Sequence, residues 1–153
     1  MTSRATMQIA QTLYEGVDIG GERVGLITYM RTDSVHMAQR AVQQARDWIE
    51  KNYGKYFVPS KPPHYKTKTK RAEEAHEAIR PTDIFRLPQD IKKYLTDDQF
   101  RLYEIIWKRT VASQMSSAKF EDTVAEISVE VQNDIHVFTA KGRTVIFPGF
   151  LRA

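Results

Sequence analysis

Hydrophobic residues recur three and four positions apart along much of the first 115 residues, which is the spacing of one face of an α-helix. This period predicts helices over residues 4–15, 35–53 and 97–115. It also allows a short helix over residues 72–79, which Pro81 must limit because the residue before a proline is pushed out of helical geometry. The first part of the chain is therefore expected to be helical.

Two of these helices follow residues that favour a helix N-terminus. Asp33 and Ser34 precede the second long helix, and both are residue types that accept hydrogen bonds from the free amides of a first turn. Thr96 and Gln99 stand three residues apart at the start of the last helix, as a capping box requires. The sequence thus predicts helix starts close to these two positions.

The hydrophobic period changes to two after residue 115, where apolar and polar side chains alternate as they do in β-strands. The alternation covers residues 123–131 and 135–139, with a turn at Asn133–Asp134, and an apolar run over 144–147 follows Lys141–Gly142. These segments predict a meander of about three strands. Helices followed by strands, rather than alternating with them, indicate an α+β fold.

The composition limits the class of protein. The chain has 153 residues, of which 41% are hydrophobic and 27% charged, so a single globular domain is expected rather than a large multidomain machine. It contains no cysteine, which excludes disulfides, thiolate zinc sites and cysteine nucleophiles. No apolar run approaches the ~18 residues of a membrane span and no signal-peptide core is present, so we expect a cytoplasmic protein without a membrane partner.

Basic residues are concentrated in one loop. The net charge is +4, and residues 51–72 contain seven lysines and arginines and no acidic residue. Prolines and Gly54 predict a long loop within this stretch, and long loops in compact domains are usually functional or mobile. This basic stretch suits a polyanion such as nucleic acid as a partner, with Lys66, Lys68 and Lys70 as candidate contacts. A lysine loop that is merely solvated explains the concentration of charge equally well.

A first candidate for chemistry is the apolar run 24–30, which is either a short strand or an extended lead into the next helix. It places Tyr29 two residues before Arg31. A phenol has a pKa of about 10 and is a poor nucleophile at neutral pH, so attack on a phosphate needs a nearby cation. The Arg31 guanidinium supplies that cation, and the amides of a helix that starts after Ser34 add an anion site. A structural tyrosine whose ring packs inward is the simpler alternative.

A second candidate surrounds His76, whose side chain titrates in the physiological range and could be held charged by Asp33 or Glu77. A zinc site is excluded here, because position 80 is Arg80 rather than a second histidine at helical spacing. Taken alone, the segment is better explained as a surface helix with an ion pair between Glu77 and Arg80.

Taken together, these two segments resemble a known family. GLITYMRTDS (residues 25–34), followed some forty residues later by EAHEAIRPTD (residues 74–83), closely resembles the cleavage domain of bacterial type IA DNA topoisomerases. Both motifs are long and rarely found elsewhere. Residues 6–16 are similar to the family's helix before the tyrosine, and residues 102–107 to the helix that leads into its β region.

The resemblance implies roles for the candidate residues. Tyr29 is implied to be the nucleophile that attacks single-stranded DNA and keeps the 5′ phosphate as a phosphotyrosine. Arg31 is implied to stabilise the scissile phosphate, and His76, steered by Asp33, to contact the DNA backbone close to it. Arg80 matches the second motif and is grouped with the DNA-binding residues, without a firm role.

The resemblance also implies components that this sequence lacks. The family uses Mg²⁺, held by an acidic cluster on a Toprim domain that also carries a general-acid glutamate, whereas no Asp-x-Asp pair occurs here. We therefore expect no metal site in this chain. We also expect it to be part of an enzyme that is inactive alone and that has the Toprim and remaining domains of the same polypeptide as partners.

The resemblance implies a division of the chain as well. Residues 1–115 would form the helical cleavage domain, and residues 116–153 an incomplete antiparallel β segment of the arch (hinge) domain. The whole enzyme would relax negative supercoils in the nucleoid of a bacterium. The alternative function is a non-catalytic module for single-stranded nucleic acid, in which the basic loop binds phosphates and aromatic side chains stack on bases.

Overall fold

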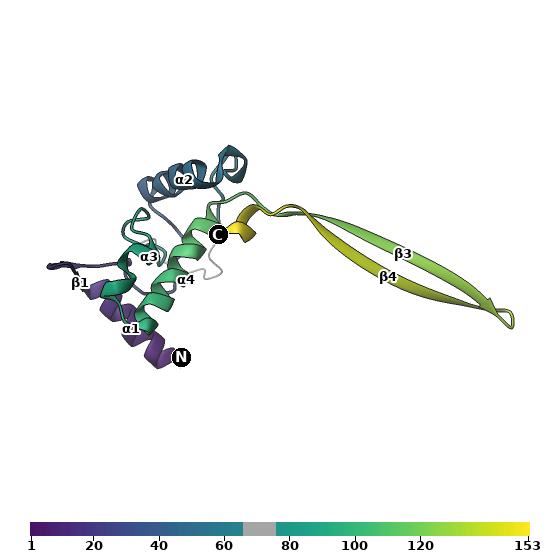
Figure 1. Cartoon of the computed structure of the whole chain (residues 1–153), viewed down its shortest axis with the longest axis horizontal. Coiled ribbons are helices and arrows are strands. Elements are labelled where there is room, and N and C mark those ends of the chain that lie inside the picture. Colours follow the sequence, from purple (N-terminus) through teal and green to yellow (C-terminus); the bar gives the residue numbers. More distant parts are fainter. Residues whose placement is uncertain (66–75) are drawn as a thin grey trace.

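The computed structural model describes residues 1–65 and 76–153. It confirms the α+β prediction, with a helical part from which a long two-stranded ribbon projects (Figure 1). The helices of the described residues are α1 (Ser3–Glu15), α2 (Gln39–Tyr53), α3 (Pro88–Ile91) and α4 (Asp97–Ser113), with 3-10 helices η1 (Lys55–Phe57), η2 (Lys92–Tyr94) and η3 (Gly149–Arg152). The strands are β1 (Val17–Ile19), β2 (Glu22–Val24), β3 (Lys119–Val131) and β4 (Asp134–Phe147).

A small β-hairpin, which the sequence did not predict, follows the first helix. Helix α1 matches the predicted helix over residues 4–15, and Gly16 ends it at a φ of +117°. Strands β1 and β2 then pair antiparallel. Gly20 and Gly21 join them with positive φ angles, which glycine adopts without steric cost. Gly20 and Gly21 therefore form the turn of this hairpin.

Helix α4 begins where its sequence predicts. The Thr96 side chain accepts a hydrogen bond from the amide of Gln99, and the Gln99 side chain accepts one from the amide of Thr96, so the capping box is confirmed. Asp97 and Asp98 in the first turn add negative charge at the end of the helix where the backbone dipole favours it. This helix contacts α1, α2, α3 and η3 and is the centre of the helical part (Figure 1).

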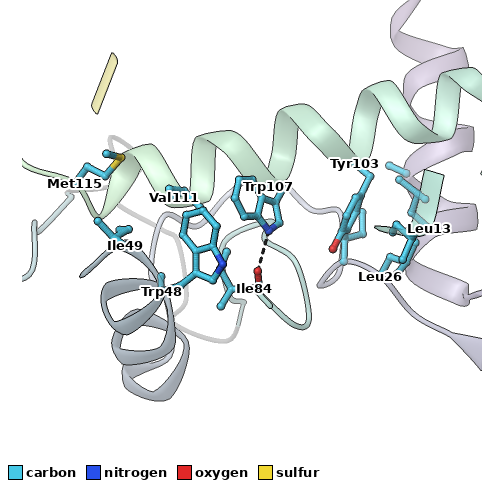
Figure 2. Close-up of a cluster of buried hydrophobic side chains, with 13 residues drawn as sticks. Leu13, Leu26, Trp48, Ile49, Ile84, Tyr103, Trp107, Val111 and Met115 are labelled. Atoms are coloured by element: carbon cyan, nitrogen blue, oxygen red, sulfur yellow. Dashed lines mark hydrogen bonds between the residues drawn. The ribbon is translucent and has the colours of Figure 1, made fainter. Parts of the chain in front are cut away.

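The hydrophobic core lies along α4. Tyr103, Trp107 and Val111 are buried on one face of this helix, and Trp48 of α2 meets Trp107 edge to face with ring centroids 4.8 Å apart (Figure 2). The indole N–H of Trp107 donates a hydrogen bond of 2.9 Å to the carbonyl oxygen of Ile84. A buried N–H without such a partner would cost about 1–3 kcal/mol, so this bond fixes the segment before α3 against the core.

The predicted start of α2 near residue 35 is wrong. The helix begins at Gln39, and Ala38 is its N-cap residue, which has no side chain able to cap. The amide of Ala38 instead donates a hydrogen bond of 2.7 Å to the carboxylate of Glu77. A carboxylate from a distant segment thus takes the place of the local cap expected from Asp33 and Ser34, and the anion site predicted at amides directly after Ser34 is not formed by this helix.

The predicted three-stranded meander is also wrong. Strands β3 and β4 form one antiparallel pair, and the second and third predicted strands are a single strand that continues through Gly142, which lies opposite Thr123. The turn lies at Gln132 and Asn133, with φ angles of +52° and +72°. Two residues with positive φ are the geometry of a tight hairpin turn that matches strand twist. Lys141–Gly142 therefore does not interrupt the strand.

The base of the ribbon is attached to the helical part. The amide of Ser116 donates to the carbonyl oxygen of Phe57, and the amide of Phe150 donates to the carbonyl oxygen of Ser116. The rings of Phe57 and Phe147 lie with centroids 4.9 Å apart. Along both strands almost all residues are exposed. The ribbon is thus fixed at one end only, while the domain boundary at residues 115 and 116 stays a prediction.

Candidate active site

The two segments with candidate chemistry lie side by side in extended conformation. The amide of Thr28 donates to the carbonyl oxygen of Arg80 at 2.9 Å, and the amide of Thr82 donates to that of Leu26 at 3.0 Å. Ile27 and Pro81 form an antiparallel bridge between the segments. Leu26 and Ile27 are almost fully buried, so the core holds this pairing in place. The run 24–30 is thus largely an extended lead beyond the end of β2 at Val24.

The hydroxyl of Thr28 provides a second link between the segments. It donates a hydrogen bond of 2.7 Å to the carbonyl oxygen of Ala78 and accepts one of 2.9 Å from the amide of Arg80. Residues 76–79 are consequently not helical, and the predicted helix over 72–79 is wrong for these four positions. The rest of it lies outside the described residues.

Tyr29 is half-exposed and is not sealed in the core. The residue keeps 46% of its surface accessible, and its ring contacts the rings of Tyr14 and His76, with centroids 5.3 and 6.0 Å away. Tyr103 is different: burial raises the pKa of its phenol, and its hydroxyl donates to the carbonyl oxygen of Arg86. Tyr29 is thus accessible to a large substrate, whereas Tyr103 has a structural environment.

The Asp33 carboxylate contacts the side chains of both Arg31 and His76 beside Tyr29. Asp33 Oδ2 lies 2.9 Å from Arg31 Nε and 3.5 Å from His76 Nδ1, and the second contact is an ion pair when the imidazole is protonated. The Arg31 side chain is 59% exposed, so its guanidinium retains donors for an anion. Asp33 Oδ1 is buried and has no hydrogen-bond partner among the described residues. The structure therefore brings together Tyr29, Arg31, Asp33 and His76.

Arg80 is engaged with its own segment. Its Nε and Nη2 atoms donate to the two carboxylate oxygens of Glu77 at 2.7 and 2.9 Å, and Nη1 donates to the carbonyl oxygen of Pro81 at 2.8 Å. The side chain is 16% exposed. The ion pair anticipated for a surface helix is present, but it is formed in extended backbone.

The Glu77 carboxylate is held in its ionised form. Partial burial by itself would raise its pKa, but the hydrogen bonds from Arg80 and the Ala38 amide, together with the charges of Arg80 and His36, lower the pKa below its ordinary value. From the sequence, Glu77 was expected either to pair with Arg80 on a surface helix or to hold His76 charged, and its bond to the Ala38 amide was not anticipated. Tyr14 was not singled out within the predicted helix over residues 4–15, although its position in the last turn before the GLITYMRTDS segment was an available signal.

The remaining candidates lie elsewhere. Lys66, Lys68 and Lys70 fall outside the described residues, so the predicted basic contact surface stays a prediction. Just before them, the hydroxyl of Tyr65 donates to the carbonyl oxygen of Ser113 at 2.8 Å, which ties this part of the basic stretch to the end of α4.

Over residues 1–65 and 76–153, no helix is long and apolar enough to cross a membrane.

Comparison with known proteins identifies the family. A family model described as DNA topoisomerase matches residues 1–153, the whole chain. The chain belongs to the bacterial DNA topoisomerase I family. It is 51% identical over 151 residues to DNA topoisomerase 1 of Xylella fastidiosa strain Temecula1, and this match covers 98% of the chain. It is 49% identical over 151 residues to DNA topoisomerase 1 of Rickettsia felis, with 99% of the chain covered.

The structural comparison agrees. Full-length topoisomerase I from Thermotoga maritima matches with a TM-score of 0.81 and 37% sequence identity, covering 99% of this chain and 23% of the solved one. This chain spans 18% of the Xylella and 19% of the Rickettsia topoisomerase. The family resemblance drawn from the two motifs is confirmed, and the chain corresponds to a small part of its relatives.

Proposed function

We propose that this chain carries the tyrosine nucleophile of a type IA DNA topoisomerase. The observation that carries the proposal is the half-exposed Tyr29 ring beside the cluster of Arg31, Asp33 and His76. Membership of the family supports the substrate, DNA, and the small share of the relatives' length supports a role as one part of a longer enzyme.

In the proposed reaction, the Tyr29 oxygen attacks the phosphorus of a phosphodiester in single-stranded DNA. A bond forms between that oxygen and phosphorus, and the bond from phosphorus to the 3′ oxygen of the preceding nucleotide breaks. The phenol gives up its proton and the 3′ oxygen gains one. Because one phosphodiester replaces another, reversal reseals the strand without ATP. Passage of another strand through the break relaxes negative supercoils.

The residues near Tyr29 have distinct proposed roles. Arg31 stabilises the negative charge of the scissile phosphate through the donors that its ion pair with Asp33 leaves free. His76 contacts the neighbouring DNA backbone, and Asp33 orients both side chains. Arg80 is a more distant candidate for DNA contact. The proposed accessory contacts of the basic loop are Lys66, Lys68 and Lys70.

Mg²⁺ is expected to accompany this activity. Across the described part of the chain, no three His, Cys, Asp or Glu side chains group so that they could hold a metal ion, so these residues do not fit such a centre. We propose that the metal ligands and the proton donor for the 3′ oxygen belong to a Toprim domain of the same polypeptide. This chain alone would then not cleave DNA.

The proposed architecture assigns residues 1–115 to a cleavage domain and residues 116–153 to the arch domain that opens the gate. The support for it is the ribbon, which leaves the helical part at Lys119 and returns at Phe147 (Figure 1). A location in the nucleoid of a bacterium follows from the proposed substrate.

The test is a Tyr29→Phe substitution in the full-length polypeptide. Incubation with labelled single-stranded DNA and Mg²⁺, followed by denaturing electrophoresis, should give a covalent adduct for the unchanged protein and none for the variant. Tyr56→Phe is the matched control, because Tyr56 is a highly exposed tyrosine away from the cluster, and it should retain the adduct. An adduct that survives Tyr29→Phe would refute the assignment.

A complementation experiment distinguishes the enzyme from the alternative binding module. This chain is mixed with a separately produced Toprim domain, Mg²⁺ and single-stranded DNA. An adduct on Tyr29 supports the enzyme. DNA binding without any adduct, in the mixture and in the full-length polypeptide alike, supports a non-catalytic module.

A further inference from the structure

The Glu77 carboxylate connects the second segment, through Arg80, to the start of α2 at Ala38. Oε1 accepts hydrogen bonds from the Ala38 amide and from Arg80 Nε, both 2.7 Å long, and Oε2 accepts one from Arg80 Nη2 at 2.9 Å. Ala38 follows the Tyr29–Asp33 segment along the chain and is the N-cap residue of α2. The Glu77 side chain, which is part of the second segment, therefore anchors the start of α2, the helix that follows the first segment along the chain.

A backbone hydrogen bond repeats this connection one residue later. The amide of Ala78 donates to the carbonyl oxygen of His36 at 2.7 Å. Residues 77 and 78 are thus both bound to residues 36–38. His76 directly precedes these two residues, and its Nδ1 lies 3.5 Å from Asp33 Oδ2.

The partner of Glu77 is equally restrained. The Arg80 guanidinium uses Nε, Nη1 and Nη2 in bonds to Glu77 and Pro81, and its backbone amide and carbonyl bond to Thr28. Thr28 is the residue before Tyr29. The pair of Glu77 and Arg80 therefore contacts Thr28, the residue before the proposed nucleophile, on one side and Ala38, the N-cap residue of α2, on the other, and Glu77 itself directly follows His76.

We propose that Glu77 is a positioning residue for DNA cleavage: with Arg80 and the Ala38 amide it holds His76 at the distance from Asp33 and Tyr29 that the reaction needs. The inference rests on the proposed function. Glu77 contacts neither DNA nor the reacting atoms and acts through His76. Displacement of a catalytic group by about 1 Å can cost as much as 100-fold in rate, so the effect belongs to the cleavage rate and not to DNA affinity.

The test measures single-turnover cleavage of labelled single-stranded DNA by the full-length polypeptide over a range of protein concentrations. Glu77→Ala removes all three accepted bonds and should lower the saturating rate constant roughly 10- to 100-fold, with the half-saturating concentration nearly unchanged. Glu77→Gln retains an oxygen for the Ala38 amide and should recover part of the rate. Glu104→Gln is the matched control, because Glu104 pairs with Lys108 on α4; it should behave as the unchanged protein.

Three outcomes would overturn the inference: an unchanged saturating rate constant in Glu77→Ala, a change confined to the half-saturating concentration, or a loss of adduct amplitude without a change of rate. The last would mean that Glu77 only keeps the protein folded. Failure of the proposed function has a different signature, because the unchanged protein would then form no Tyr29-dependent adduct.

A double-mutant cycle tests the pair. If Glu77 and Arg80 act as one unit, Glu77→Gln combined with Arg80→Gln should be about as slow as the slower single variant. Additive losses would overturn the assignment of Arg80 to this unit and would support its independent contact with DNA.

Discussion

The ring of Tyr14 meets the ring of Tyr29 edge to face, with centroids 5.3 Å apart and an interplanar angle of 64°. Tyr14 lies in the last turn of α1, and the carbonyl oxygen of its neighbour Leu13 accepts a 2.7 Å hydrogen bond from the amide of Leu26. The end of α1 thus supports the proposed nucleophile through a ring contact and through the backbone three residues before it.

This contact predicts that the ring of Tyr14, and not its hydroxyl, matters for cleavage. Edge-to-face pairs contribute about 0.5–1.5 kcal/mol, so Tyr14→Leu should slow adduct formation by about 2- to 10-fold. Tyr14→Phe keeps the ring and should react at the unchanged rate. Single-turnover cleavage by the full-length polypeptide checks both. Equal losses in the two variants would show that the hydroxyl carries the effect.

A close backbone approach beside the same tyrosine gives a second prediction. A Cβ atom at Gly25 would lie 2.8 Å from the carbonyl oxygen of Tyr14, which is too short for any real contact. Gly25→Ala should therefore push α1 away from the extended segment. Overpacking of this kind costs about 1–3 kcal/mol, to be measured as the free energy of urea unfolding by circular dichroism.

The control for Gly25→Ala is Gly142→Ala in the ribbon. No atom lies within 4 Å of a Cβ atom built at Gly142. This substitution should leave stability unchanged or raise it slightly, because alanine restricts the unfolded chain more than glycine does. A loss in both variants would mean that the cost is not specific to the contact with Tyr14.

Elements determined by neighbouring residues were predictable from the sequence. The start of α4 depends on Thr96 and Gln99, which are three positions apart and whose side chains accept hydrogen bonds from each other's backbone amides. The start of α2 could not be predicted in this way, because its cap is the Glu77 carboxylate, 39 residues from Ala38. The turn of the ribbon was misplaced by one residue, and Gly142 was taken for an interruption although an extended strand tolerates it.

The candidate site was predicted from motifs and not from periodicity. Physical reasoning about Tyr29 alone favoured a ring packed inward, whereas the ring is half-exposed. The two segments meet through backbone hydrogen bonds and through the hydroxyl of Thr28, which bonds to residues 50 and 52 positions further along the chain. No local pattern encodes such a pairing, and only the resemblance of both segments to one family indicated it.

The basic loop gives a third prediction, which concerns salt. Replacing Lys66, Lys68 and Lys70 together by glutamine should weaken single-strand binding at low salt. If each lysine neutralises one phosphate, the slope of log affinity against log salt should fall by about 0.7 for each. Fluorescence anisotropy at several salt concentrations measures both quantities. Unchanged affinity at low salt would remove the loop from the proposed DNA contacts.

The Glu77 carboxylate gives a fourth prediction, which concerns stability against pH. Its pKa is lowered in the folded protein, since the bonds from Arg80 and the Ala38 amide and the charge of His36 outweigh its partial burial. The unfolded chain therefore binds a proton here at higher pH than the folded chain does. The stabilisation is fully present above the ordinary glutamate pKa of about 4.3 and is lost as pH falls through the lower folded value.

The measurement compares urea unfolding of the unchanged chain and of Glu77→Gln at pH values from about 3 to 6. Other carboxylates contribute equally to both proteins, so the difference between them isolates Glu77. That difference should be largest at the upper end of the range and should shrink on acidification, because glutamine carries no charge to lose. A difference that is constant across the range would mean that the ion pair with Arg80 does not contribute to stability, and that Glu77 holds the start of α2 by geometry alone.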